Sequence, residues 1–237
     1  MKIAILLSGQ PRFTEDFNLF LSNLKGYTEA DWFVYISNNF NSNNTKSVIE
    51  VADIWKTFDP SWAYERIKSM LPHNNTIRSF EISDADNQIF PPVVAIHETD
   101  IPANAFKMFY NMYMSDQARQ QYEQDHNFKY DLVIRTRADL GLYNELNLLN
   151  LDFSNNVIIM PTNEWHGNPR ANDQFAIGKS DSMSIYGTAY TRLKEYNNRG
   201  AMFHPESMVG YNLRVHNIPT KDGNFIAGIR RYPLIKD

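Results

Sequence analysis

Short continuous apolar runs alternate with stretches of helical periodicity along most of this chain. Runs without polar alternation are typical of strands buried on both faces, as in parallel sheets. Strands are predicted at residues 2–7, 32–36, 77–82, 132–134, 157–160, 175–177 and 225–229. Helices are predicted at residues 15–26, 48–55, 60–71, 104–126, 183–199 and 205–213. This alternation predicts one α/β domain over residues 1–237, with a mostly parallel central sheet flanked by helices.

Composition narrows the classes of protein that this domain can represent. Cysteine is absent from the 237 residues, which excludes disulfides, thiolate metal sites and cysteine nucleophiles. Lys and Arg total 23 against 27 Asp and Glu, and this net charge of -4 argues against a nucleic-acid-binding protein. No apolar run approaches the ~18 residues of a membrane span. The apolar run at the start is too short for a signal-peptide core. We therefore expect a cytoplasmic protein with no membrane span; the sequence does not indicate its oligomeric state.

Three polar segments follow predicted strands, where open α/β sheets bind their ligands. The first is Ser8-Gly9-Gln10-Pro11-Arg12. Gly9 allows a ligand to approach the backbone closely, and Arg12 offers a planar fork for phosphate or carboxylate. The alternative is an ordinary strand-to-helix turn with a surface arginine. Neither a G-x-G-x-x-G fingerprint nor a P-loop is present.

The second segment is Arg135-Thr136-Arg137-Ala138-Asp139, directly after the predicted strand 132–134. Burying such charges is costly unless they are paired or face a wet cleft. If the extended path continues, Arg135, Arg137 and Asp139 lie on one side of it. Two guanidiniums and a carboxylate then suit a diphosphate with a divalent cation. The alternative is an internal salt-bridge cluster.

The third segment runs from Trp165 to Gln174 and is rich in turn-forming residues. Trp165 suits stacking on a sugar or base, or else anchors a surface loop to the core. Asp173 is a candidate general base, or else a turn or cap residue. Further along, His204 precedes Pro205 at a predicted helix entrance. A lone histidine there is either structural or faces a cleft.

These segments together resemble a GT-A-type glycosyltransferase, in particular the bacterial and viral family related to lipopolysaccharide and capsule synthesis. The likeness is carried by residues 5–12, 130–139, 172–178, 183–190 and 204–206. It implies a GT-A-like, Rossmann-like domain with a nucleotide-sugar donor and a carbohydrate acceptor. In this family the loop after the first strand holds the nucleotide, and a D-x-D element holds a divalent cation on the diphosphate. Here the D-x-D position reads Arg137-Ala138-Asp139, so an arginine replaces the first acid.

The resemblance also implies a role for each candidate residue. Asp173 is the expected base or acceptor-binding acid, a base if the reaction inverts the anomeric centre and an acceptor-orienting group if it retains it. The other expected roles are nucleotide and diphosphate binding by Ser8, Gly9, Gln10, Arg12, Arg135 and Arg137, acceptor binding by Trp165 and His166, and binding of Mn²⁺ or Mg²⁺ by Asp139 and His204.

Two other functions remain open from the sequence. A non-catalytic module that binds a nucleotide or carbohydrate on the same fold is favoured by Arg137 in place of an acid. A nucleotidyltransferase that builds sugar nucleotides can have a similar fold. Its glycine-rich, basic first loop is largely missing from residues 8–12.

Overall fold

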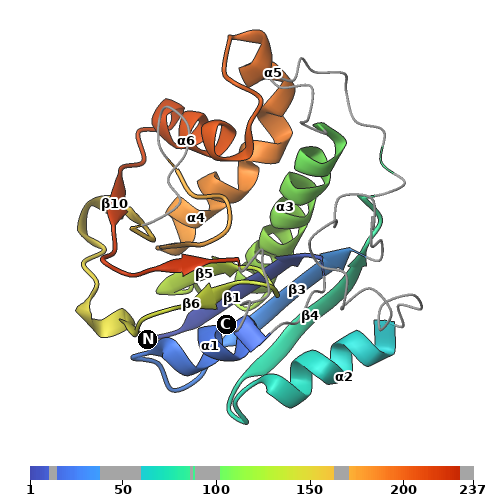
Figure 1. Cartoon of the computed structure of the whole chain (residues 1–237), viewed down its shortest axis with the longest axis vertical. Helices are drawn as coiled ribbons and strands as arrows, with labels where there is room; N and C mark the ends of the chain where they lie inside the picture. Colours follow the sequence, from blue (N-terminus) through green and yellow to red (C-terminus); the bar gives the residue numbers. More distant parts are fainter. Residues whose placement is uncertain (11–14, 38–59, 86–87, 89–101, 163–170, 230–237) are drawn as a thin grey trace, which may run out of the picture.

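The computed structural model describes residues 1–10, 15–37, 60–85, 88, 102–162 and 171–229. Its centre is a seven-stranded sheet with helices on both faces (Figure 1). The strands follow the order β10-β8-β9-β5-β1-β3-β4. In chain order they are β1 (Ile3–Gly9), β3 (Asp31–Ser37), β4 (Thr76–Ser83), β5 (Leu132–Thr136), β8 (Ile158–Met160), β9 (Ala176–Gly178) and β10 (Thr220–Asp222). The prediction of a mostly parallel α/β sheet is confirmed, and β9 runs antiparallel to both its neighbours.

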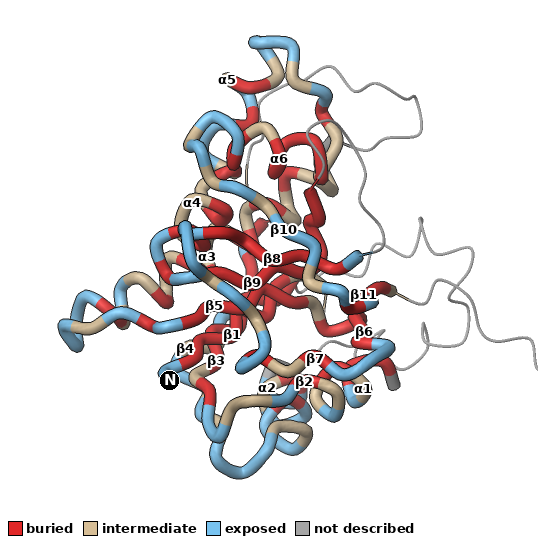
Figure 2. The backbone as a smooth tube through the Cα atoms, turned by 90° about the vertical axis from the view of Figure 1, so that its left-hand side faces the viewer, coloured by how far each residue is buried: buried red, intermediate tan, exposed pale blue. Residues whose placement is uncertain are grey.

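Alternating side chains of the strands divide the core into two layers. Ile3, Ile5 and Leu7 point to one layer, which contains α1 (Glu15–Asn23) and α2 (Pro60–Met70). Ala4 and Leu6 point to the other, which contains α3 (Pro102–Asp125), α4 (Ser180–Gly187), α5 (Leu193–Asn198) and α6 (Pro205–Val215). Figure 2 shows the strands β1, β5, β8 and β9 as the buried centre between these layers. The central strands β1, β3, β5, β8 and β9 are mostly apolar because both of their faces are covered, whereas the edge strands β4 and β10 contain exposed polar residues.

The predicted helices at the N-terminal half are confirmed at 15–26, 60–71 and 104–126, within a few residues. The predicted helix 48–55 lies outside the described residues. The helix predicted from Met183 to before Gly200 is helical but not continuous: α4 ends at Gly187, a 3-10 helix covers Thr188–Arg192, and α5 follows. At Gly187 an added Cβ would lie 2.9 Å from Asp116 of α3, so this glycine lets α4 pack closely against α3.

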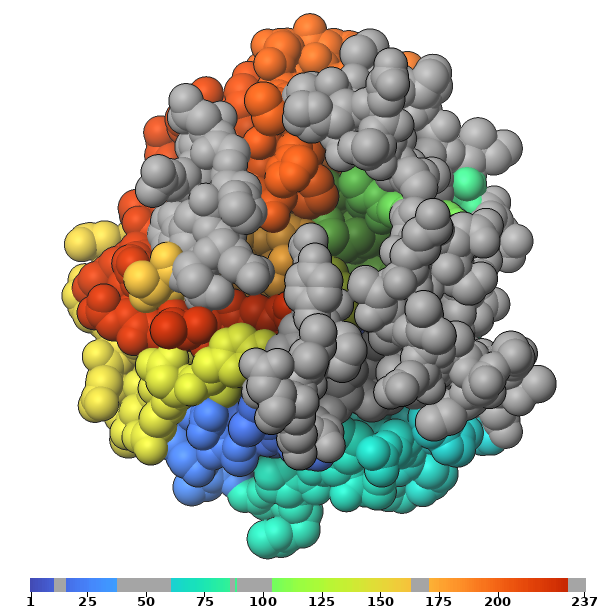
Figure 3. Space-filling view, viewed as in Figure 1, coloured from blue at the N-terminus to red at the C-terminus, as the bar shows by residue number. Residues whose placement is uncertain are grey.

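Small strand pairs close one side of the molecule. β2 (Leu24–Lys25) pairs with β7 (Leu146–Asn147), and β6 (Gly141–Leu142) pairs with β11 (Ala227–Gly228). In Figure 3 the blue α1 region, the yellow-green β6–β7 region and the red segment around β10 and β11 lie next to one another. The strand predicted at 225–229 is thus shortened to two residues and lies outside the main sheet.

Strand order places a topological switch point between β1 and β5. From β1 the chain adds β3 and then β4 on one side, crosses through α3, and returns to β5 on the other side of β1. Ligands of open α/β sheets bind beyond the carboxyl ends of the strands at such a point. Gly9 and Thr136 end these two strands.

Candidate functional site

The carboxyl ends of β1 and β5 bring two of the predicted segments together. In their parallel register, Leu6 lies opposite Arg135 and Leu7 opposite Thr136. Ser8 and Arg135 therefore share the face covered by α3, α4 and α6, because side chains alternate along a strand. Gly9 has a φ of 121°, in the region that favours glycine, and its missing side chain leaves open space. Gln10 is half-buried, whereas Arg12 lies outside the described residues.

Arg135 is a buried guanidinium with few partners. Its Nη1 donates to the carbonyl oxygen of Gln174, but its Nε and Nη2 have no hydrogen-bond partner among the described residues. The residue is 1 % exposed, and burial lowers its pKa. A buried charge without matching hydrogen bonds costs several kcal/mol. These two nitrogens can donate to a ligand that accepts hydrogen bonds.

The expected alternation of the second segment fails after Thr136. The strand ends there, and a turn closes with the Leu140 amide donating to the Arg137 carbonyl at 3.4 Å. The turn faces Arg137 toward Asp139, whose two carboxylate oxygens accept from Nε and Nη2 at 2.8 and 2.9 Å. Arg137 and Asp139 thus form the internal salt bridge that the sequence analysis left as an alternative. Arg135 is not part of that pair.

The third segment enters the site through a side-chain turn. Asn172, not Asp173, makes it: its Oδ1 accepts from the amides of Gln174 and Phe175 at 2.9 and 2.8 Å. Asp173 is left 5 % exposed, with Oδ1 unpartnered among the described residues. The Gln174 side-chain oxygen is likewise buried and unpartnered. Trp165 and His166 lie outside the described residues, so their expected roles remain predictions.

Helices α4 and α6 supply residues that the sequence did not single out. The hydroxyl of Tyr186 on α4 donates to the Asn172 carbonyl at 2.9 Å. Burial raises the pKa of Tyr186, the charge of Arg135 opposes this, and the charges of Asp173 and Glu206 add to it. These groups therefore lie within electrostatic reach of one another. Tyr186 was predicted only as part of an apolar helix face, where its spacing from Met183 gave no functional signal.

His204 lies where the sequence placed it, at the first cap position of α6, beside Pro205. Its Nδ1 lies 2.7 Å from Oε2 of Glu206, which is nearly buried in the first turn of α6. The neighbouring Ser207 has a buried hydroxyl without a partner among the described residues. His204 thus contacts the carboxylate of Glu206, whose charge also acts on Tyr186.

The expected metal ligands do not form a metal-binding set. Both oxygens of Asp139 are held by Arg137, and His204 is paired with Glu206. Across the described ranges, no group of three or more His, Asp or Glu side chains is positioned to hold a metal ion. Binding of a divalent cation by Asp139 and His204 therefore stays a prediction, and the chemistry below is derived from side chains alone.

A tyrosine cluster borders the site at the ends of β3 and β4. The hydroxyls of Tyr35 and Tyr110 donate to Oδ1 of Asp84 at 3.2 and 2.7 Å. Tyr190 packs against Tyr110, with ring centroids 5.3 Å apart. The buried Asn111 beside them accepts a hydrogen bond from Ser83. Aromatic spacing on the helix predicted at 104–126 indicated a core stripe; the structure also places it beside the carboxyl edge.

Neither protein-family models nor curated proteins provide a match to this chain. Function therefore has to be argued from the site. None of the helices described is long and apolar enough to cross a membrane.

Proposed function

We propose that this chain is a nucleotide-sugar-dependent glycosyltransferase that transfers a sugar to a glycan or another hydroxyl acceptor, on a GT-A-like domain. One observation carries the proposal. Arg135 is buried at the switch point of a mostly parallel sheet, and its Nε and Nη2 have no hydrogen-bond partner among the described residues, while Gly9 at the end of the neighbouring strand β1 leaves open space. An anionic ligand at this point would bring negative charge and hydrogen-bond acceptors to Nε and Nη2 of Arg135.

The diphosphate of the donor is the group that fits this role. During transfer the bond between the anomeric carbon and the diphosphate oxygen breaks, and its electron pair leaves with the diphosphate. Preorganised donors stabilise that negative charge, and losing one typically costs about 3 kcal/mol of transition-state stabilisation. Arg135 is held by the Gln174 carbonyl, and Arg137 by Asp139, so both guanidiniums are fixed before the ligand arrives.

Asp173 is the proposed general base. Its Oδ1 is buried and has no partner among the residues that the structure describes, and the charge of Asp173 acts on both Arg135 and Tyr186. In a direct displacement the acceptor oxygen bonds to the anomeric carbon while its proton passes to this carboxylate. Asp173→Asn removes the base and keeps the shape. We expect it to lower transfer by about 10²–10⁴-fold, with donor binding retained.

Stabilisation by nucleoside diphosphates tests the binding step. A ligand at a hundred times its dissociation constant adds about 2.7 kcal/mol to the free energy of unfolding. We expect this gain with at least one nucleoside diphosphate, equally in EDTA and in Mn²⁺, because guanidiniums supply the positive charge. No gain with any base contradicts the proposal. A gain only in Mn²⁺ contradicts the metal-free part of it.

A non-catalytic binding module is the second candidate, because the Arg137–Asp139 salt bridge occupies the position where a cation would be held. It predicts the same nucleotide stabilisation without turnover. Donor hydrolysis or transfer that disappears in Asp173→Asn excludes it.

A further inference from the structure

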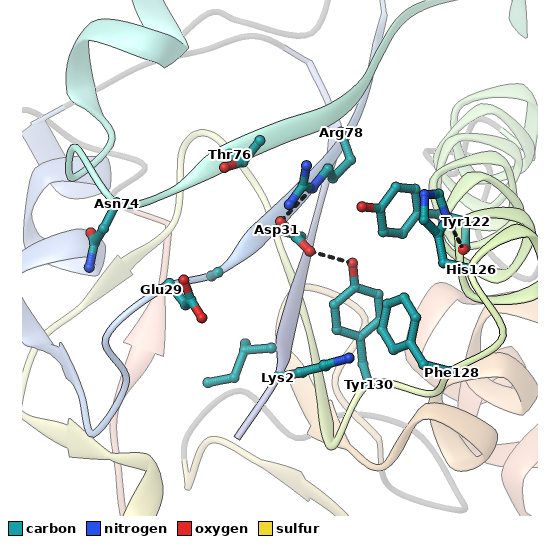
Figure 4. Close-up of a pocket in the computed structure, with 12 residues that line it drawn as sticks. Lys2, Glu29, Asp31, Asn74, Thr76, Arg78, Tyr122, His126, Phe128 and Tyr130 are labelled. Carbon is teal, nitrogen blue, oxygen red and sulfur yellow. Dashed lines mark hydrogen bonds and ion pairs between the residues drawn. The ribbon is translucent and has the colours of Figure 1, made fainter.

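A cavity opens at the amino ends of the strands, opposite the carboxyl ends where the proposed transfer site lies. It has a volume of about 350 Å³, and all the residues that line it are described. Its walls come from the amino ends of β1, β3 and β4, the last turns of α3, and the segment after α3 (Figure 4). Ligands of α/β sheets normally bind at the carboxyl edge, so the proposed transfer reaction does not account for this cavity.

One wall of the cavity is braced from inside. Asp31 accepts a hydrogen bond from Nε of Arg78 and another from the hydroxyl of Tyr130, each at 2.7 Å. The guanidinium of Arg78 also lies over the ring of Tyr122, 5.3 Å from its centroid. Figure 4 shows Asp31 between the two groups that it holds. Such a wall loses little freedom when a ligand binds.

Other polar groups around the cavity are left without partners. The Lys2 ammonium lies over the Phe128 ring at 4.1 Å and has no carboxylate partner in the described part of the chain. Within the same described residues, the exposed Glu29 carboxylate and the Tyr122 hydroxyl have no hydrogen-bond partner either. Nδ1 of His126 lies 2.9 Å from the Tyr122 carbonyl oxygen, so the other ring nitrogen, Nε2, can contact a ligand.

The balance of these groups selects a class of ligand. Two cations, Lys2 and Arg78, face two carboxylates, Glu29 and Asp31, so the walls favour neither an anion nor a cation. Lys2 and the Tyr122 hydroxyl provide donors, Glu29 provides acceptors, and the rings of Tyr122, Phe128 and Tyr130 line the same cavity. A neutral molecule with several hydroxyls and an apolar ring face uses all of them, and the volume is in the range of small-molecule sites.

We propose that this cavity binds one neutral sugar residue of a glycan. It lies about 20 Å from the carboxyl edge, since β1 spans seven residues at ~3.3 Å each. The further assignment of that glycan as the distal part of the acceptor rests on the proposed function. Sugar binding itself does not.

Titration of the ¹⁵N-labelled protein with methyl glycosides of glucose, galactose and mannose, followed in ¹H–¹⁵N correlation spectra, tests the site. We expect at least one to shift the amides of Tyr122, His126 and Phe128. Lys2→Gln and Glu29→Gln should each weaken that binding at least fivefold. Lys25→Gln and Glu145→Gln, which change exposed residues of the same types elsewhere, should alter it less than twofold.

Three results overturn the proposal: no shift at these amides with any of the sugars, tighter binding of glucuronate or inorganic phosphate than of every neutral sugar, or equal losses in the control variants. A saturating nucleoside diphosphate should leave the sugar titration unchanged. Absence of nucleotide binding overturns the proposed function and leaves this site standing. Loss of sugar binding in Glu29→Gln with normal transfer to short acceptors supports two separate sites.

Discussion

Arg119 and Arg135 are both fully buried, at 0 % and 1 % exposure, but their surroundings differ. Every nitrogen of Arg119 has partners. Nε and Nη2 contact Asp116 at 2.8 and 2.7 Å, and Nη1 contacts Glu123 at 2.8 Å. The hydroxyls of Ser180 and Ser184 accept from Nη1 and Nη2 at 2.6 and 2.7 Å. For Arg135, only Nη1 has a partner among the described residues, the carbonyl oxygen of Gln174.

The comparison distinguishes Arg119, whose charge stabilises the fold, from Arg135, whose charge we propose binds a ligand. The two carboxylates around Arg119 offset its burial, and the two serines tie α3 to α4. Arg135 lies at the carboxyl end of β5, and the described residues provide no hydrogen-bond acceptor for its Nε and Nη2. Burial alone does not distinguish the two; the count of unmatched hydrogen bonds does.

Arg119→Met should give the largest effect on folding. It leaves Asp116 and Glu123 buried without their countercharge, and breaking a buried pair in this way costs about 3–5 kcal/mol of unfolding free energy. Urea denaturation measures the loss. Arg199→Met removes an exposed ion pair with Glu195 and should cost less than about 1 kcal/mol. A loss as small as this for Arg119→Met would contradict the structural role assigned to Arg119.

Arg135→Met should have the opposite outcome. Removing a buried guanidinium whose Nε and Nη2 have no hydrogen-bond partner among the described residues relieves a desolvation cost, and losing the bond to the Gln174 carbonyl costs about 1 kcal/mol. Without ligand, the unfolding free energy should stay equal or rise, while stabilisation by a nucleoside diphosphate should disappear. Arg119→Met should keep that ligand stabilisation despite its weaker fold. Loss of about 3 kcal/mol in ligand-free Arg135→Met would make Arg135 structural as well.

The sequence predicted Arg135 because a charged residue directly after an apolar run is visible in the sequence alone. It did not predict which charges pair, because that depends on the turn at residues 137–140 that ends the extended path. Nor did it predict the partners of Arg119 at Ser180 and Ser184, some sixty positions away. Six of the seven strands of the main sheet were predicted from apolar runs, whereas β10 (Thr220–Asp222) is short and polar and was missed. The two-residue strands β2, β6, β7 and β11 are too short to have a detectable period, and the antiparallel direction of β9 leaves no trace in its composition.

A smaller effect tests whether α4 positions the acid beside Arg135. Tyr186→Phe removes the hydrogen bond to the Asn172 carbonyl and should cost about 1 kcal/mol of stability. Because Asn172 shapes the turn that carries Asp173, transfer should fall as well. Tyr196→Phe is the matched control, since it removes a buried bond to Asn212 at 2.7 Å. Equal losses of transfer in both variants would show that Tyr186 acts on stability alone.

The smallest effect concerns Asp84, a carboxylate that water reaches. The hydrogen bond from Tyr110 lowers the pKa of Asp84 from its ordinary value of 3.8. A lowered folded pKa contributes stability that is present above the ordinary pKa and is lost as pH falls through the folded value. Asp84→Asn should therefore be less stable than the wild type at pH 7, by less than about 1 kcal/mol because the group is exposed. The gap should close below pH 3.8, and Tyr110→Phe should show the same closure. A gap that persists in acid would mean that Asp84 acts through its shape rather than its charge.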